Sequence, residues 1–321
     1  MNQVEMVSLG ELVKEGHSYR SFDSIWDFSE VERMLKKRKK NNPHEGYGLE
    51  RLFRCLIIQY LEDLSDRELE RYLEENTAAK WFCGFGLLEK TPRYNVFTQV
   101  RAGIGTSLLA KIFQALKKQL ISRGYMNEVF TFVDASQLIS KAQLWAERDK
   151  AIEQKIEKLN NKTLPDIAHD KEAKIGCKGK NKFWYGYKKH VSVDMQSGFV
   201  NKVAITPANT PDQKGFKHVS PRNGATYTDQ AYCDKETAKD ALTKGTILRA
   251  IKKNNMKTKN KSLDKLITKI RSPYERIFSK TRRRVRYIGV VKNQFSAFME
   301  AIAFNFKRSA VLAQQLSLIH I

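Results

Sequence analysis

Apolar residues recur every three or four positions along the first part of the chain, which is the period of a helix with one buried face. This pattern predicts a helix from Gly48 to Leu61 and a second helix from Asp66 to Asn76. Ser65 and Glu68 have the spacing of a capping box, in which two side chains satisfy backbone groups at the start of a helix. We therefore expect an all-helical N-terminal domain over residues 1–126.

The two helices and the short turn between them are compatible with a helix-turn-helix that binds DNA ends. A small helical bundle without DNA contact explains the pattern equally well, because phosphate would be repelled by four glutamates of the second helix, Glu68, Glu70, Glu74 and Glu75. The basic run from Lys36 to Lys40 would contact phosphates more readily. Both interpretations stay open on this pattern alone.

From residue 129 the helical period gives way to short runs of β-branched and aromatic residues. Val129–Val133 predicts a strand that ends at Asp134. The runs Phe183–Val193 and Phe199–Ile205 lie on either side of a glycine-containing turn, which predicts an antiparallel hairpin. Further strands are expected at residues 226–228 and 246–251, separated by a helix-like stretch.

The alternation of strands and helices predicts a mixed α/β fold, in which helices cover a central sheet. We assign residues 127–310 to this second domain. Within it, residues 140–182 form a polar excursion that predicts a helical insertion or a long loop. The status of residues 311–321, an apolar tail, is left undecided by the pattern.

The net charge changes what such a fold could bind. The chain has 58 Lys and Arg against 35 Asp and Glu, a formal charge of +23. Residues 1–126 carry only +3 of this excess, and residues 127–321 carry +20. The segment Lys252–Arg286 alone holds 14 basic residues and two acids. Such a surface attracts polyanions, and nucleic acid is the expected partner.

Several classes of protein do not fit the composition. No apolar run approaches the roughly 20 residues that a membrane-spanning helix needs, and the acidic start does not resemble a secretory signal. The four cysteines lie far apart in the sequence, at Cys55, Cys83, Cys177 and Cys233. The absence of a close pair argues against a disulfide framework and against a zinc site. We expect a protein of the reducing cytoplasm, without membrane contact.

Three carboxylates stand out by their placement. Asp134 and Asp229 each follow an apolar strand, and Glu275 lies in a helix-like segment of the most basic region. Three hard oxygen donors suit Mg²⁺ or Mn²⁺. Chance explains the pattern too, because a chain with 35 acids will end some strands with one. Glu275 has its own alternative, an ordinary helical ion pair with Arg271.

The sequence around these residues resembles the insertion-sequence transposases of the DDE type, in particular the IS-five branch of the IS-four group. The resemblance runs from about Phe130 to Arg308. The segments that carry it are Phe132–Ser136, Lys182–Asp194, Gly198–Asp212, Thr228–Tyr232, Arg271 with Glu275, and Ala301–Arg308. Three positions depart from the family pattern, with Ala231 for a usual Gly, Thr268 for Tyr and Arg282 for Lys.

The resemblance implies an RNase H-like catalytic domain that cleaves DNA at the ends of an insertion sequence and transfers the 3′-hydroxyl ends into target DNA. Asp134, Asp229 and Glu275 would be the catalytic residues and the ligands of two Mg²⁺ or Mn²⁺ ions. We assign a second set of residues to contacts with the DNA backbone: Lys188, His190, Lys269, Arg271, Arg282, Arg283 and Arg284.

The implied partner is double-stranded DNA, as terminal inverted repeats and as target, in the bacterial nucleoid. A homodimer would hold the two DNA ends, and no nucleotide cofactor is implied. Two other functions remain. The chain could bind DNA without catalysis, as a decayed transposase or a repressor, or it could be a general RNase H-like nuclease. Retention of all three acids favours the enzyme, because a pure DNA binder has no chemical need for them.

Overall fold

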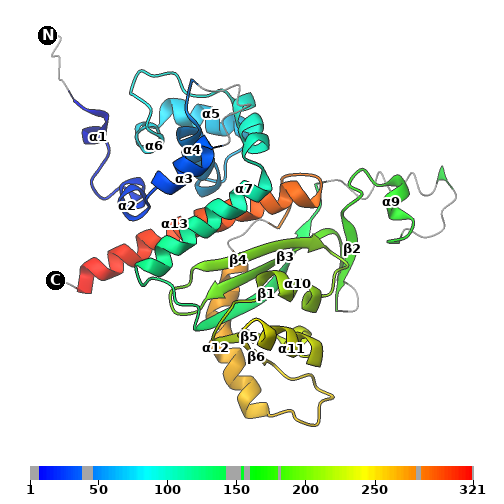
Figure 1. Ribbon diagram of the computed structural model, residues 1–321. Helices are drawn as coiled ribbons and strands as arrows, with labels where there is room; N and C mark the ends of the chain where they lie inside the picture. Colours follow the sequence, from blue (N-terminus) through cyan, green and yellow to red (C-terminus); the bar gives the residue numbers. More distant parts are fainter. Residues whose placement is uncertain are drawn as a thin grey trace. The chain divides into compact units, whose positions relative to one another are not determined.

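The computed structural model describes residues 7–37, 46–141, 153–154, 160–179, 182–279 and 283–319. The chain forms two compact units. The first consists of Met1–Arg123 and Phe298–Ile321, and the second of Gly124–Ala297. Figure 1 shows the helices of the first unit and the sheet of the second.

The first unit is helical, as its periodic apolar pattern predicts. Its elements before residue 124 are α1 (Leu9–Leu12), α2 (Ser18–Ile25), α3 (Ser29–Lys36), α4 (Leu49–Leu61), α5 (Asp66–Glu75), α6 (Thr77–Cys83) and α7 (Tyr94–Ser122). The capping box at the start of α5 is present. The Glu68 backbone N–H donates to Ser65 Oγ at 3.3 Å, and the Ser65 N–H donates to the Glu68 carboxylate at 2.7 Å. Both predicted helices are therefore confirmed.

A last helix, α13 (Val290–Ile319), supplies an aromatic side chain to the core of the first unit. The ring of Phe306 is fully buried and stacks on Trp26 with the centroids 4.6 Å apart. The Trp26 indole N–H donates to Ser309 Oγ at 3.0 Å. Residues 298–310, which the sequence pattern assigned to the sheet domain, thus pack in the helical unit, because the apolar side chains of α13 have their partners there.

The second unit is built on a six-stranded mixed sheet. Its strands are β1 (Phe130–Ile139), β2 (Lys174–Lys178), β3 (Lys182–Asp194), β4 (Val200–Pro207), β5 (Ala225–Thr228) and β6 (Ile247–Ala250). Strand order is β2-β3-β1-β5-β6, and β4 pairs with β3. The β1–β3 and β3–β4 pairs are antiparallel, whereas β1–β5 and β5–β6 are parallel. The predicted hairpin and the mixed α/β class are confirmed.

Helices cover both faces of this sheet (Figure 1). The covering helices are α10 (Asp212–Val219), α11 (Lys235–Thr243) and α12 (Lys261–Ser279). The short 3₁₀ helix η2 (Gln230–Tyr232) follows β5, and α9 (Leu164–Ile167) precedes β2. On one face Val133 packs with Phe216 of α10 and Ala241 of α11. On the other face the ring of Phe132 meets Tyr274 of α12 at 6.1 Å. Because alternate residues of a strand point to opposite faces, even-numbered positions of β1 near Phe132 face α12.

One expectation about the strands is wrong, and one strand was not expected. Asp134 does not end its strand, because β1 continues to Ile139 and its residues pair with β3 throughout. The sequence pattern missed this part of β1 because the residues that follow Asp134 (Ala135, Ser136 and Gln137) are small or polar and only half buried. In the polar excursion 140–182, the described residues 160–179 hold α9 and also β2, which pairs with β3. No helix among the described residues is long and apolar enough to cross a membrane.

The packing of α13 gives a direct test. Phe306→Ala removes a fully buried ring that contacts Phe22, Trp26 and Phe28. We expect the free energy of unfolding to fall by about 3–5 kcal/mol, the usual cost of truncating a core Phe. Urea unfolding of the full chain measures it. Val311→Ala is the matched control, since Val311 lies on the same helix and is 43% exposed; an equal effect of both changes would contradict the packing.

Candidate active site

Asp134 projects from the middle of β1 toward the α12 face of the sheet. Its position alternates with Phe132, which packs on that face. The side chain keeps 23% of its surface exposed. One carboxylate oxygen, Oδ1, accepts a hydrogen bond from the Ala135 N–H at 2.8 Å, and this contact fixes the orientation of the group.

Asp229 follows β5, the parallel neighbour of β1. The register pairs Phe132 with Tyr227, so the residue two positions beyond Tyr227 lies at the level of Asp134. Adjacent strands are only about 4.8 Å apart. Asp229 also caps η2, since its Oδ1 accepts a hydrogen bond from the Ala231 N–H at 2.9 Å. The sheet itself therefore brings two carboxylates, 95 residues apart in sequence, to one place.

Arg271 links this edge of the sheet to the third acid. Its side chain is 4% exposed, and its Nη2 lies 3.8 Å from Asp134 Oδ2 and 3.6 Å from Glu275 Oε1. The guanidinium carbon also lies 5.4 Å from the centre of the Phe132 ring. Arg271 and Glu275 are four residues apart in α12, and side chains at this spacing share a helix face. One buried cation is therefore shared by two carboxylates from different elements.

The electrostatic environment differs between the acids. Burial, and then the negative charge of Asp229, raise the pKa of Asp134 to about 7, while Arg271 opposes this rise. Burial also raises the pKa of Asp229. Asp212, at the start of α10, adds to the repulsion at both groups. Glu275 is the outer member, with 53% of its side chain exposed.

The donor set fits a divalent cation in its chemistry. Carboxylates are the hard oxygen ligands that Mg²⁺ and Mn²⁺ prefer, and two carboxylates that repel each other in a partly buried site gain most from a shared cation. Among the described residues, however, no three His, Cys, Asp or Glu side chains are gathered closely enough to hold a metal ion. Asp134 and Asp229 lie together, and Glu275 is connected to them through Arg271.

The residues assigned to DNA contacts fall into two groups. Lys188 Nζ donates to Asp212 Oδ1 at 2.8 Å and to the Thr210 carbonyl at 2.9 Å. His190 is fully buried, with its Nε2 2.9 Å from Thr206 Oγ1, and burial lowers its pKa to about 4. Like Arg271, these side chains are largely buried and have partners inside the protein.

The exposed group consists of Lys269 on α12 and of Arg283 and Arg284. Arg282 lies outside the described residues. The arginine run is attached to the far end of β1, where the Ile139 N–H donates to the Arg283 carbonyl at 2.7 Å and the Val285 N–H donates to Ile139 at 2.9 Å. Backbone pairing therefore places these cations at the end of the strand that carries Asp134, a link that the sequence did not predict.

Two further residues of this site were not identified as such from the sequence. Asp212 was noted only as part of a family segment, yet its charge acts on Asp134 and Asp229. Tyr232 is fully buried, its hydroxyl has no hydrogen-bond partner among the described residues, and its pKa is raised by burial and by Asp134. The Asp229–Tyr232 motif was the available signal for Tyr232.

Comparison with known families decides the identity. Residues 7–103 match the model of a transposase domain (DUF772), and residues 149–306 match the model of a transposase DDE domain. The chain is a DDE transposase. Asp229 and Glu275 lie inside the second match, and Asp134 lies before its start. No solved structure matches the chain.

Membership explains the architecture described above. The DDE domain has an RNase H-like fold, which confirms the expected fold class of the second unit. The transposase is an enzyme that cleaves DNA and transfers strands, and its family uses divalent metal ions. The match does not distinguish the IS-five branch, which stays a prediction.

The raised pKa of Asp134 predicts a pH-dependent stability of the transposase. Because the folded protein holds this proton more tightly than the unfolded chain does, the free energy of unfolding should fall as the pH rises from about 4 to 7. Asp134→Asn removes the charge. At pH 8 in EDTA the free energy of unfolding of the variant should therefore be higher than that of wild type, by at most about 4 kcal/mol. Urea unfolding at pH 5 and pH 8 measures this; equal stabilities at pH 8 would contradict the repulsion.

Proposed function

We propose that Asp134, Asp229 and Glu275 form the catalytic site of this transposase, which we call the acidic site. The observation that supports it best is the double contact of Arg271, whose Nη2 lies within 4 Å of both Asp134 and Glu275. This contact joins the central strand to α12, and the strand register adds Asp229. Two of the three acids thereby contact one buried guanidinium, and the third lies beside Asp134 at the end of the neighbouring strand.

The acidic site would hold two Mg²⁺ or Mn²⁺ ions. Asp134, Asp229 and Glu275 would be the residues that hold them. When bound, such a pair of ions stabilises the attacking and the leaving oxygen of a phosphodiester displacement. Around them the protein's own groups fix the ligands, since the Ala135 and Ala231 N–H groups orient Asp134 and Asp229.

Arg271 is the positioning residue of the acidic site. Its buried charge favours the ionised forms of Asp134 and Asp229 against the burial that disfavours them. It also directs Glu275 toward β1. Arg271 would thus favour the charged forms of the carboxylates in part and hold Asp134 and Glu275 near one another before DNA binds.

Lys269, Arg283 and Arg284 would contact the DNA backbone beside the acidic site, with Arg282 of the same run. Contacts of this kind position a strand without reading its sequence. The DNA would be the terminal inverted repeats and the target, in the nucleoid. Two copies of the chain would hold the two ends, and the freed 3′-hydroxyl would attack the target without a nucleotide cofactor.

Cleavage assays test the acidic site. With Mg²⁺ and DNA that carries the inverted repeats, we expect Asp134→Ala, Asp229→Ala and Glu275→Gln each to slow cleavage by at least about 100-fold, because even groups that only support a metal ligand are worth 10–100-fold. Glu236→Gln is the control, an exposed acid on α11 that should cleave normally.

Other outcomes of the cleavage assays would change the site or favour another function. Normal cleavage by Glu275→Gln would remove that residue from the site. Equal cutting of unrelated DNA by the wild-type chain would favour a general nuclease. Binding of the repeats without cleavage in Mg²⁺ or Mn²⁺ would favour a DNA binder that has lost catalysis.

Salt dependence tests the exposed cations. Each phosphate contact adds roughly 0.9 to the negative slope of log K against log salt. We expect Lys269→Ala, Arg283→Ala and Arg284→Ala each to reduce the slope by about that amount, as measured by fluorescence anisotropy with a labelled duplex. Lys239→Ala, an exposed lysine on α11, is the control. Unchanged slopes in all three variants would place the DNA elsewhere.

A further inference from the structure

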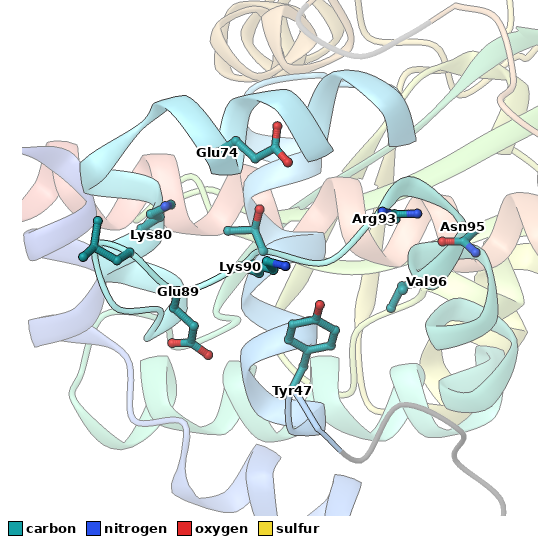
Figure 2. A pocket seen from close by; sticks show the side chains of 10 residues that line it. Tyr47, Glu74, Lys80, Glu89, Lys90, Arg93, Asn95 and Val96 are labelled. Carbon is teal, nitrogen blue, oxygen red and sulfur yellow. The ribbon is translucent and has the colours of Figure 1, made fainter.

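The helical unit contains a basic pocket, which is far along the sequence from the acidic site. It is a cavity of about 510 Å³ at the loop between α6 and α7, lined among others by Lys80, Lys90, Thr91 and Arg93. Figure 2 shows the three basic side chains spread across the pocket, with Glu74 on one side and Tyr47 on the other.

Two of these cations have no partner of their own. Lys90 and Arg93 are exposed, and neither side chain makes a hydrogen bond or ion pair within the part of the chain that the structure describes. Lys80 Nζ donates one hydrogen bond, to the Leu87 carbonyl at 2.8 Å, which orders the loop, and its charge acts on nearby Glu89, whose pKa it helps to lower. A pocket with two cations that have no partner attracts an anion.

Thr91 provides an independent observation. The residue is 7% exposed, and its Oγ1 has no hydrogen-bond partner among the described residues. A buried hydroxyl without a partner loses free energy unless a ligand or water satisfies it. Because Thr91 lines the cavity, a ligand held there could accept its hydrogen bond.

The start of α7 adds to the positive field. This helix begins at Tyr94, and the side chain of its N-cap residue, Arg93, makes no capping hydrogen bond. The N-terminus of a helix carries a partial positive charge and free N–H groups, which favour anions. Glu70 accepts one of these N–H groups, that of Tyr94, at 2.9 Å, so the first turn is satisfied only in part.

The acids around the pocket do not cancel this field. Glu89 is held by Arg51 at 2.7 Å and accepts a further hydrogen bond from the Gly86 N–H at 2.9 Å. Its charge is thus already compensated. Glu74 is exposed and has no ion-pair partner among the described residues, which leaves one acid against three cations.

We propose that this pocket binds a backbone phosphate of DNA, with Lys90, Arg93 and the Thr91 hydroxyl as its contacts. The inference rests on the DNA-handling function proposed above. Lys80, Lys90 and Arg93 lie in a row, which suits a charged strand better than a single small ion (Figure 2). The apolar side chain of Leu88, 95% exposed at the rim, would lie against a deoxyribose.

Chemical protection tests the contact in the unmodified full chain. Lysines are acetylated with and without a 20-base-pair duplex, and their modification is followed by mass spectrometry. We expect the duplex to slow acetylation of Lys90 at least fivefold and to leave Lys118 unchanged, an exposed lysine near the other end of α7. Equal rates at Lys90 with and without DNA would overturn the proposal. Equal protection by inorganic phosphate at the same phosphate concentration would assign the pocket to a free anion and overturn it too.

Variants give a test that depends on the sign of the charge. Lys90→Ala with Arg93→Ala should reduce the salt slope of duplex binding by roughly 1.8, two contacts at 0.9 each. Glu74→Gln should tighten binding, because it removes a repulsion, and Thr91→Val should weaken it about fivefold, the worth of one hydrogen bond. Lys118→Ala should behave as wild type. Binding by Lys90→Ala with Arg93→Ala equal to that by Lys118→Ala would contradict the proposal.

Failure here and failure of the acidic site are distinguishable. Asp134→Ala should lose cleavage and keep the protection of Lys90, because the pocket contacts do not involve the carboxylates. Loss of protection with normal cleavage would refute the pocket alone, and protection without any cleavage by wild type would refute the acidic site alone. Thermal melting of each pocket variant should match wild type, and a lowered melting temperature would assign the binding defect to unfolding.

Discussion

The proposed acidic site depends on how two partly buried carboxylates, Asp134 and Asp229, are kept close together and linked to a third acid. Burial and mutual repulsion favour the protonated forms of Asp134 and Asp229, and they would weaken the site if nothing opposed them. Arg271 opposes them, because its buried guanidinium lies near Asp134 and Glu275 at once. A divalent ion satisfies the same demand, which is why a metal-dependent reaction suits this arrangement.

The sheet is built to present these groups on one face. On β1, Val133 faces the apolar core under α10 and α11, while Phe132 and Asp134 face α12. A shift of one residue in strand register would bury Asp134 in that core. The long antiparallel pairing of β1 with β3 fixes the register, and the last residue of β1, Ile139, pairs through its backbone with Arg283 and Val285.

Much of this could be predicted from sequence. The capping box marked the start of α5, and the short apolar run before Asp229 located the end of β5. The strand around Asp134 was cut short because its second half alternates without strong hydrophobicity, and β2 was hidden in a polar segment. The burial of His190 was not predictable, since it depends on α10, where Gly215 leaves room for the ring.

Metal binding tests the central claim most directly, because it needs neither DNA nor turnover. Calorimetric titration of Mn²⁺ into the full chain compares wild type with Asp134→Asn, Asp229→Asn and Glu275→Gln, with Glu236→Gln as control. The account predicts that each of the three changes weakens Mn²⁺ binding by about 10-fold or more while the control binds as wild type. Wild-type affinity in any of the three would show that its carboxylate does not belong to the site.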